Sequence, residues 1–182
     1  MSYKILDLKF DQNGVRFTIN PVVIYDDQEM VLVDCGHPDA LPKLVQAESI
    51  YDSLPEDQKE SAKRFAAYLE SIEHTKVDIL LNDGDRFDCC GSFEIIATPG
   101  HMPGHISIYL PESKTLISGD ALVVQKGELE IANPQYSLDI EGTRASALKL
   151  SKLEIDRVIC YHGGLYTGEV HSALIKMASV ES

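Results

Sequence analysis

Three side chains that can bind a metal ion stand where short apolar segments end. His101, Asp120 and His162 each lie directly beside a glycine. A strand end holds a side chain on a rigid frame, and glycine lets the backbone approach a ligand closely. Two imidazoles and a carboxylate are ligands of hydrolytic zinc sites and of non-haem iron sites. One such residue alone would indicate an ordinary hydrogen-bonded side chain, but three in the same setting favour a metal site.

Apolar segments with the alternation or the continuous runs of strands precede these residues. The expected strands cover residues 15–19, 22–25, 30–33, 77–81, 93–97, 106–110, 115–117 and 157–160. The first three are expected to form a small antiparallel meander. Helices are expected at about 139–153 and 168–178, and the three candidate ligands would then follow the strands 93–97, 115–117 and 157–160.

A polar, glycine-free segment separates two β-rich parts. Residues 38–45 are a short helix candidate. Between 51 and 72 the apolar residues Ala62, Phe65 and Leu69 fall on one face of an amphipathic helix. We therefore expect a single domain over residues 1–182, with a helical insert at about 47–73.

Four stretches carry a resemblance to a known family. They are residues 31–36 (VLVDCG), 95–107 (IIATPGHMPGHIS), 116–122 (LISGDAL) and 158–164 (VICYHGG). In order and separation they resemble the motifs of the metallo-β-lactamase superfamily. The resemblance covers most of residues 15–178 apart from the helical insert. It implies an α/β (α+β) fold, a four-layer αββα sandwich with the site at one edge of its two sheets.

The resemblance also implies roles for these residues. His101 and His162 would each bind one of two divalent metal ions, with Zn²⁺ the expected metal, and Asp120 would bridge them. His105 and Asp34 would lie near the metal ligands and steady the site without binding metal themselves. The implied activity is hydrolysis by a metal-bound hydroxide. The implied substrates are a small ester, thioester, lactone, β-lactam or phosphoester, and fold alone does not choose among them.

One motif of that family is missing. The six histidines of the chain include no two that lie two positions apart, so a His-x-His-x-Asp-His loop is absent. The family fold would thus lack one βα unit, with a join at about Val45–Gln46. Three explanations stay open: the natural chain has a further segment, the segment was deleted, or the lineage lost the metal site and kept the fold. We favour the first two, because drift rarely preserves three ligands while removing a whole unit.

The sequence contains other candidate residues and allows a second class of function. His37 follows a strand end and could replace a lost ligand, whereas Cys160 is expected to be a small buried hydrophobe. The pair Cys89-Cys90 lacks the spacing of a redox or metal motif and is expected to be structural. The alternative to a hydrolase is a non-catalytic binding or scaffold module on the same fold, with an incomplete metal site.

Charge and composition limit the partners. The chain of 182 residues has 16 Lys and Arg against 29 Asp and Glu, a formal net charge of −13. Such a surface repels phosphate backbones and anionic lipids, so we expect neither a nucleic-acid nor a membrane partner. Apolar runs are short and no signal peptide is evident, which predicts a cytoplasmic location. The expected partners are a small-molecule substrate and, through the sheet edge that a lost unit exposes, a possible homodimer.

Overall fold

The computed structural model describes residues 2–12, 15–27, 29–33 and 79–179. By its internal contacts the chain divides into two compact units, residues 1–35 with 81–182 and residues 36–80. Everything below concerns the first unit, apart from residues 79–80. The predicted helices at 38–45 and 51–72 lie outside the described residues, so the single domain with a helical insert stays a prediction.

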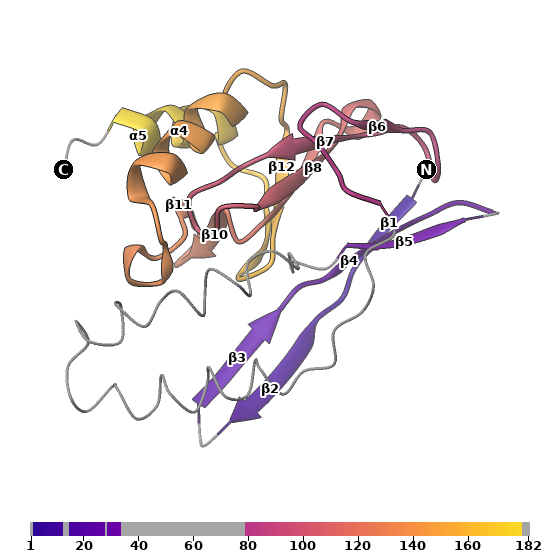
Figure 1. The fold of residues 1–182 in the computed structure, drawn as a ribbon. Helices are drawn as coiled ribbons and strands as arrows, with labels where there is room; N and C mark the ends of the chain where they lie inside the picture. Colours follow the sequence, from indigo (N-terminus) through magenta and orange to yellow (C-terminus); the bar gives the residue numbers. More distant parts are fainter. Residues whose placement is uncertain (1, 13–14, 28, 34–78, 180–182) are drawn as a thin grey trace. The chain divides into compact units, whose positions relative to one another are not determined.

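A six-stranded sheet forms the centre of this unit (Figure 1). Its strands lie in the order β13 (Gly164–Tyr166), β12 (Arg157–Cys160), β9 (Thr115–Gly119), β8 (Ile106–Leu110), β7 (Phe93–Ala97) and β6 (Arg86–Phe87). Neighbours are antiparallel except β9 and β12, which are parallel. A parallel pair needs a crossover connection, and here it contains a hairpin and a helix.

Both faces of the sheet are buried, which explains why its strands are mostly apolar and do not alternate between polar and apolar residues. One face contributes Ile96, Tyr109, Leu116 and Val158 to a core that includes the helices. The residues beside them point the opposite way, and Ile95, Ile108, Ile117 and Ile159 belong to a second core that includes strands near the N-terminus.

Two helices and a hairpin cover the first face. They are α4 (Ile140–Leu150), α5 (Val170–Ser179) and the hairpin of β10 (Leu122–Gln125) with β11 (Glu128–Ile131). The Asp139 side chain accepts a hydrogen bond from the Gly142 backbone and so caps α4. Two short 3₁₀ turns, Pro111–Ser113 and Pro134–Tyr136, complete the connections.

A three-stranded sheet covers the second face. It has the order β1 (Ser2–Ile5), β4 (Val22–Tyr25) and β5 (Met30–Val33), and Val22 and Ile24 are buried against the central sheet. A separate ribbon pairs β2 (Leu8–Gln12) with β3 (Val15–Ile19). These are a helical and two sheet layers of the four-layer sandwich that the motifs implied.

Two of the predictions were wrong. Residues 15–33 do not form one meander, because β3 pairs with β2 and not with β4. Asn20 and Pro21 separate β3 from β4, and the Asn20 side chain donates to Leu6 O and to Asp7 Oδ1 at the start of the ribbon. The strand expected at 77–81 is also absent where it is described, since residues 79–81 form no strand and are exposed.

The other expected strands and both expected helices are present. The sequence did not predict β1, β2, β6 and β13, and it did not predict the hairpin of β10 and β11. Its two-residue turn is Lys126-Gly127, with φ angles of 52° and 83°. Such turns usually carry Asn or Asp before the Gly, so the lysine gave no hairpin signal.

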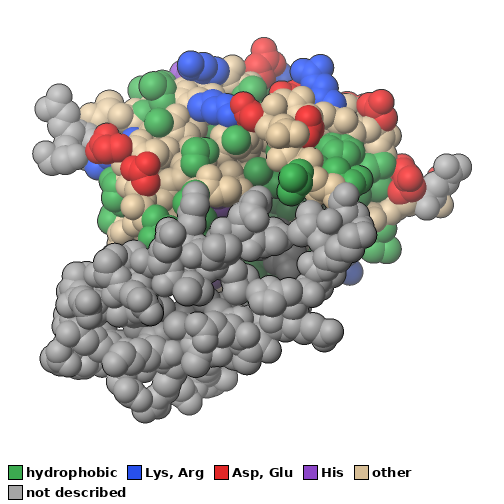
Figure 2. All heavy atoms as spheres, in the orientation of Figure 1, with side chains coloured by type: hydrophobic (Ala, Val, Ile, Leu, Met, Phe, Trp, Pro, Cys, Tyr) green, Lys and Arg blue, Asp and Glu red, His purple; other side chains and the backbone are tan. Residues whose placement is uncertain are grey.

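The described surface is mixed in character. Acidic, basic and apolar side chains are interspersed on the face that Figure 2 shows. No helix within the described ranges is long and apolar enough to cross a membrane.

Candidate metal centre

Three strands of the central sheet end at the same edge. Because β8 is antiparallel to both β7 and β9, and β9 is parallel to β12, the strands β7, β9 and β12 run in one direction. Their carboxyl ends therefore meet at one edge. His101, Asp120 and His162 all follow these ends, and the structure brings them together there.

The two histidines face different oxygens of one carboxylate. His101 Nε2 lies 3.9 Å from Asp120 Oδ2, and His162 Nε2 lies 3.5 Å from Asp120 Oδ1. The side chains of His101 and Asp120 are 20% and 18% exposed, whereas that of His162 is 48% exposed. The group is thus mostly buried and opens to the outside at His162.

This group fits a metal ion by its own chemistry. Within the described ranges, the buried atoms His101 Nδ1 and Asp120 Oδ1 have no hydrogen-bond partner. Burial raises the pKa of Asp120, although both histidines act to lower it. Burial also lowers the pKa of His101, and His162 adds to that effect. A buried carboxylate between two imidazoles offers ligand atoms to a cation and is costly without one.

The loop that carries His101 is fixed to the start of α4. The backbone N–H groups of Leu138 and Asp139 donate to His101 O and Gly100 O, and Ser146 Oγ donates to Pro99 O at 2.7 Å. Gly100 has a φ of 136°, and a side chain there would collide with the backbone of Thr143 in α4. Glycine is therefore required next to His101.

A similar close approach fixes His162. The backbone N–H of Val124 in β10 donates to His162 O at 3.0 Å. Gly163 follows with a φ of 91°, and a Cβ there would collide with Val124 O. On its other side, His162 Nδ1 lies 3.4 Å from Thr18 O at the end of β3. The missed hairpin of β10 and the N-terminal ribbon therefore both position this ligand candidate.

A closed chain of hydrogen bonds holds the backbone of Asp120. Its N–H donates to His105 Nε2 at 3.0 Å, so His105 Nδ1 carries the proton and donates to Thr98 Oγ1 at 2.9 Å. Thr98 Oγ1 can then donate to Ser107 Oγ, which donates to the backbone carbonyl of Ser118. Burial lowers the pKa of His105 to about 4, which keeps the ring neutral as this chain requires.

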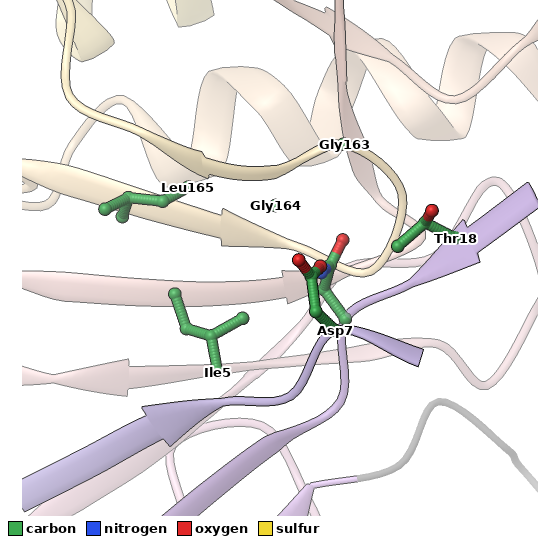
Figure 3. Close-up of a pocket in the computed structure, with 7 residues that line it drawn as sticks. Ile5, Asp7, Thr18, Gly163, Gly164 and Leu165 are labelled. Atoms are coloured by element: carbon green, nitrogen blue, oxygen red, sulfur yellow. The ribbon is translucent and has the colours of Figure 1, made fainter. Parts of the chain in front are cut away.

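An open cavity lies beside this centre. Its volume is about 490 Å³ and it adjoins His162 in the chain through Gly163 and Gly164. Figure 3 shows the side chains of Ile5, Asp7, Thr18 and Leu165 that line it. Asn20 completes the lining. Polar and apolar groups thus surround a space within the range typical of small-molecule sites.

The structure describes only some of the other candidates. Asp34 and His37 lie outside the described residues. Cys160 is fully buried as expected, and burial raises the pKa of its thiol to about 12. His171 Nδ1 lies 3.1 Å from Ser151 O, away from the three ligand candidates.

The sequence interpretation missed the residues that complete the chain behind Asp120. Thr98, Ser107 and Ser118 are each at most 1% exposed. Ser107 and Ser118 interrupt otherwise apolar strands. A hydroxyl inside an apolar run must find a partner when it is buried, and this signal could have identified them.

Comparisons with known proteins show the family of the chain and its fold. A family model described as the metallo-beta-lactamase superfamily matches residues 50–162. The probable metallo-hydrolase YflN of Bacillus subtilis (strain 168) is 36% identical over 85 residues, which cover 41% of this chain and 32% of that protein. Hydroxyacylglutathione hydrolase GloC of Haemophilus influenzae is 33% identical over 121 residues, which cover 65% of this chain and 53% of that protein.

The chain spans about a third or less of the length of several curated relatives that it matches, YflN among them. Among solved structures, a metallo-beta-lactamase from Pontibacter korlensis has a TM-score of 0.64 at 17% identity and is covered to 95%, with 98% of this chain. The B3 metallo-beta-lactamase BLEG-1 has a TM-score of 0.64 at 21% identity and is covered to 100%, again with 98% of this chain. At such identities the likeness shows the fold alone.

Proposed function

The chain belongs to the metallo-beta-lactamase superfamily and has its fold, and from this premise we propose that it is a metal-dependent hydrolase acting on a thioester. The observation that carries the proposal is the arrangement around Asp120. Its two carboxylate oxygens face two imidazoles, His101 and His162, that come from separate strands. Such a set is typical of hydrolytic metal centres.

The residues of the chain would divide the work. A bound divalent ion, with Zn²⁺ as the expected metal, supplies Lewis-acid chemistry by polarising a carbonyl and acidifying water. His101, Asp120 and His162 would together hold the ion. His105 accepts a hydrogen bond from the Asp120 backbone N–H and so holds it in place, independently of metal binding. The cavity beside His162 would bind the substrate.

The choice of a thioester comes from the relatives. Several of them are named hydroxyacylglutathione hydrolases, and the match to one covers 65% of this chain. The cavity supports this choice, because Ile5 and Leu165 could contact apolar parts of an acyl compound while Asp7 and Asn20 offer polar contacts. Ester, lactone, β-lactam and phosphoester substrates are the competing outcomes of the test.

The absent His-x-His-x-Asp-His motif limits the number of metal ions. Three retained ligands can hold one ion with a water molecule but leave a second ion with too few. A chain of this sequence is therefore expected to bind at most one ion, weakly, at the group of His101, Asp120 and His162. The missing motif also favours the second candidate function, a binding or scaffold module without catalysis.

A substrate panel with metal titration tests the proposal. The purified protein, with its mass verified, is assayed after metal removal and after Zn²⁺ addition. The panel holds a hydroxyacylglutathione, the matching oxygen ester, a lactone, a β-lactam and a phosphoester. We expect Zn²⁺-dependent hydrolysis that is at least about tenfold faster for the thioester than for the others. Faster hydrolysis of another class would overturn the substrate, and zinc binding without any hydrolysis would favour the module.

A further inference from the structure

Two hairpin turns from different sheets meet at the edge opposite the candidate metal centre. One joins β4 to β5 and contains Asp26 and Glu29, and the other joins β6 to β7 and contains Cys89 and Cys90. The turn of Cys89 and Cys90 precedes β7, whereas His101 follows it. Five residues of β7 separate them, which is about 17 Å along the strand.

Three potential ligand atoms converge where the turns meet. The thiol sulfurs of Cys89 and Cys90 and a carboxylate oxygen of Glu29 all lie within 4.8 Å of one another. A tetrahedral zinc ion with Zn–S bonds of about 2.3 Å needs ligand atoms roughly 3.8 Å apart. A small side-chain adjustment therefore brings the three atoms onto one ion.

The backbone presents these groups in fixed positions. The turn of Asp26 and Glu29 is closed twice, since Asp26 N donates to Glu29 O at 3.0 Å and Glu29 N donates to Asp26 Oδ1 at 2.9 Å. Cys90 is fully buried and has a left-handed backbone with a φ of 53°, which points its thiol inward while Cys89 is half-buried. Glu29 is exposed and leaves one side of the group open to water.

The electrostatic surroundings favour a cation. Burial raises the pKa of Cys90, and the charges of Asp26, Cys89 and Glu29 raise it further. The charged groups that act on this thiol are thus acidic, while a backbone hydrogen bond from Asp26 supports the sulfur. A divalent ion would relieve this concentration of negative charge and allow both thiols to ionise.

We propose that Cys89, Cys90 and Glu29 form a second metal site, which takes a thiophilic divalent ion of the zinc class and fastens the β4–β5 turn to the β6–β7 turn. Two sulfurs select zinc or cadmium over magnesium or calcium, and a water molecule can complete the tetrahedron. The ion would close a loop of about 60 residues, from Glu29 to Cys89. Its role is structural, and it does not depend on the proposed hydrolase activity.

Cadmium is a suitable probe, because cadmium–thiolate bonds absorb in the ultraviolet whereas bonds to histidine and aspartate do not. The reduced, metal-free full chain is titrated with Cd²⁺, and in parallel its melting temperature is measured with and without Zn²⁺. We expect one ion with two thiolate bonds per chain, and a higher melting temperature with Zn²⁺. A Cys35→Ser background excludes the thiol at residue 35, and Cys160 lies in the other core of the unit, apart from Cys89 and Cys90.

Two variants and a matched control decide the outcome. Cys89→Ser should lose the absorption at Cd²⁺ concentrations that saturate the unaltered chain, together with the thermal shift. Glu29→Gln should weaken Cd²⁺ binding by at least about tenfold. A loss of this size is typical even for residues that only hydrogen-bond to a metal ligand. Glu128→Gln alters an exposed glutamate at the start of β11, beside another hairpin turn, and should change nothing.

The proposal would be overturned if the unaltered chain gave no thiolate absorption, or if Cys89→Ser and Glu29→Gln both bound Cd²⁺ as it does. Should Cys89→Ser fail to fold, the pair of glutamate variants gives the answer by itself, since both glutamates are exposed. Loss of hydrolysis is not a readout here, so a failure of the proposed activity would leave this test intact.

Discussion

Two groups of buried polar side chains lie next to each other at the site edge of the central sheet, and they differ in one respect. The chain from His105 through Thr98 to Ser107 is closed, because each donor in it has an acceptor. The group around Asp120 is open, since Asp120 Oδ1 and His101 Nδ1 are buried and have no hydrogen-bond partner within the described residues. Both groups share the backbone of Asp120.

This difference indicates which group supports the site and which group could bind a ligand. Buried polar groups without partners cost roughly 1–3 kcal/mol each, so a fold retains them where something outside the protein supplies the partner. The closed chain explains how the open group stays in place, because it fixes the strand end from which Asp120 projects. The open group would then carry out the chemistry, and the closed chain would hold Asp120 in position for it.

Removing the charge of the open group should have the largest effect. Asp120→Asn keeps the size of the side chain but loses the negative charge that would hold metal. Loss of at least about 100-fold in zinc-dependent kcat is expected, with no loss of thermal stability, because burial already disfavours this charge. Asp156→Asn, at an exposed carboxylate before β12, is the control. Activity within twofold of the unaltered chain would remove Asp120 from the mechanism.

A substitution at Gly163, which displaces the neighbouring His162, should have the next largest effect. Gly163→Ala places a methyl group against Val124 O at a φ of 91°, so strain and overpacking add to a loss of about 2–5 kcal/mol. Gly127→Ala has nearly the same φ, 83°, but no atom within 4 Å, and should lose only about 1–2 kcal/mol. Urea unfolding measures both. Equal losses would mean that the close approach to β10 is unimportant.

Opening the closed chain should have a smaller effect. Thr98→Val removes the hydroxyl between His105 and Ser107. It leaves the His105 Nδ1–H without an acceptor and Ser107 Oγ without its donor, at about 1–3 kcal/mol of unfolding free energy. Thr143→Val is the control, because the Asp139 carbonyl that its hydroxyl contacts keeps a bond to the Thr143 backbone. If both variants lost the same stability, the chain behind Asp120 would not act as a network.

A surface ion pair on β7 should have the smallest effect. Lys149 Nζ lies 2.5 Å from Asp83 Oδ1, and both side chains contact the backbone of Ala97 at the end of β7. The hydrogen bond from Lys149 holds the pKa of Asp83 below its usual value. A lowered carboxyl pKa stabilises the fold above the unfolded pKa of about 4 and ceases to do so as the pH falls through the folded pKa.

Lys149→Gln should therefore lose less than about 1 kcal/mol at pH 7, because the pair is largely exposed. The difference in melting temperature from the unaltered chain should shrink as the pH falls below about 4, and it should disappear once Asp83 is protonated in the folded chain. A difference that persisted at low pH would show that Lys149 acts through its bond to Ala97 O and not through the charge of Asp83.

Much of the fold could be predicted from local pattern. Residues 93–97, 106–110 and 157–160 are apolar runs bounded by turns, and the structure places strands there. The pattern failed where pairing depends on distant contacts. The ribbon of β2 and β3 is separated from β4 by Asn20, whose side chain bonds Leu6 and Asp7 fourteen and thirteen residues earlier. Periodicity shows that a segment is extended, and it does not show which segment pairs with it.

The same division holds at the two sites. The amino-acid sequence by itself determined that His101, Asp120 and His162 follow apolar segments beside glycine, because alternation and glycine are local properties of the chain. Only the tertiary structure decided that each imidazole faces its own oxygen of Asp120, and that Glu29 meets Cys89 and Cys90 across about 60 residues. Strand order and the packing of one sheet on another set those distances, and they depend on contacts between remote residues that no local spacing encodes.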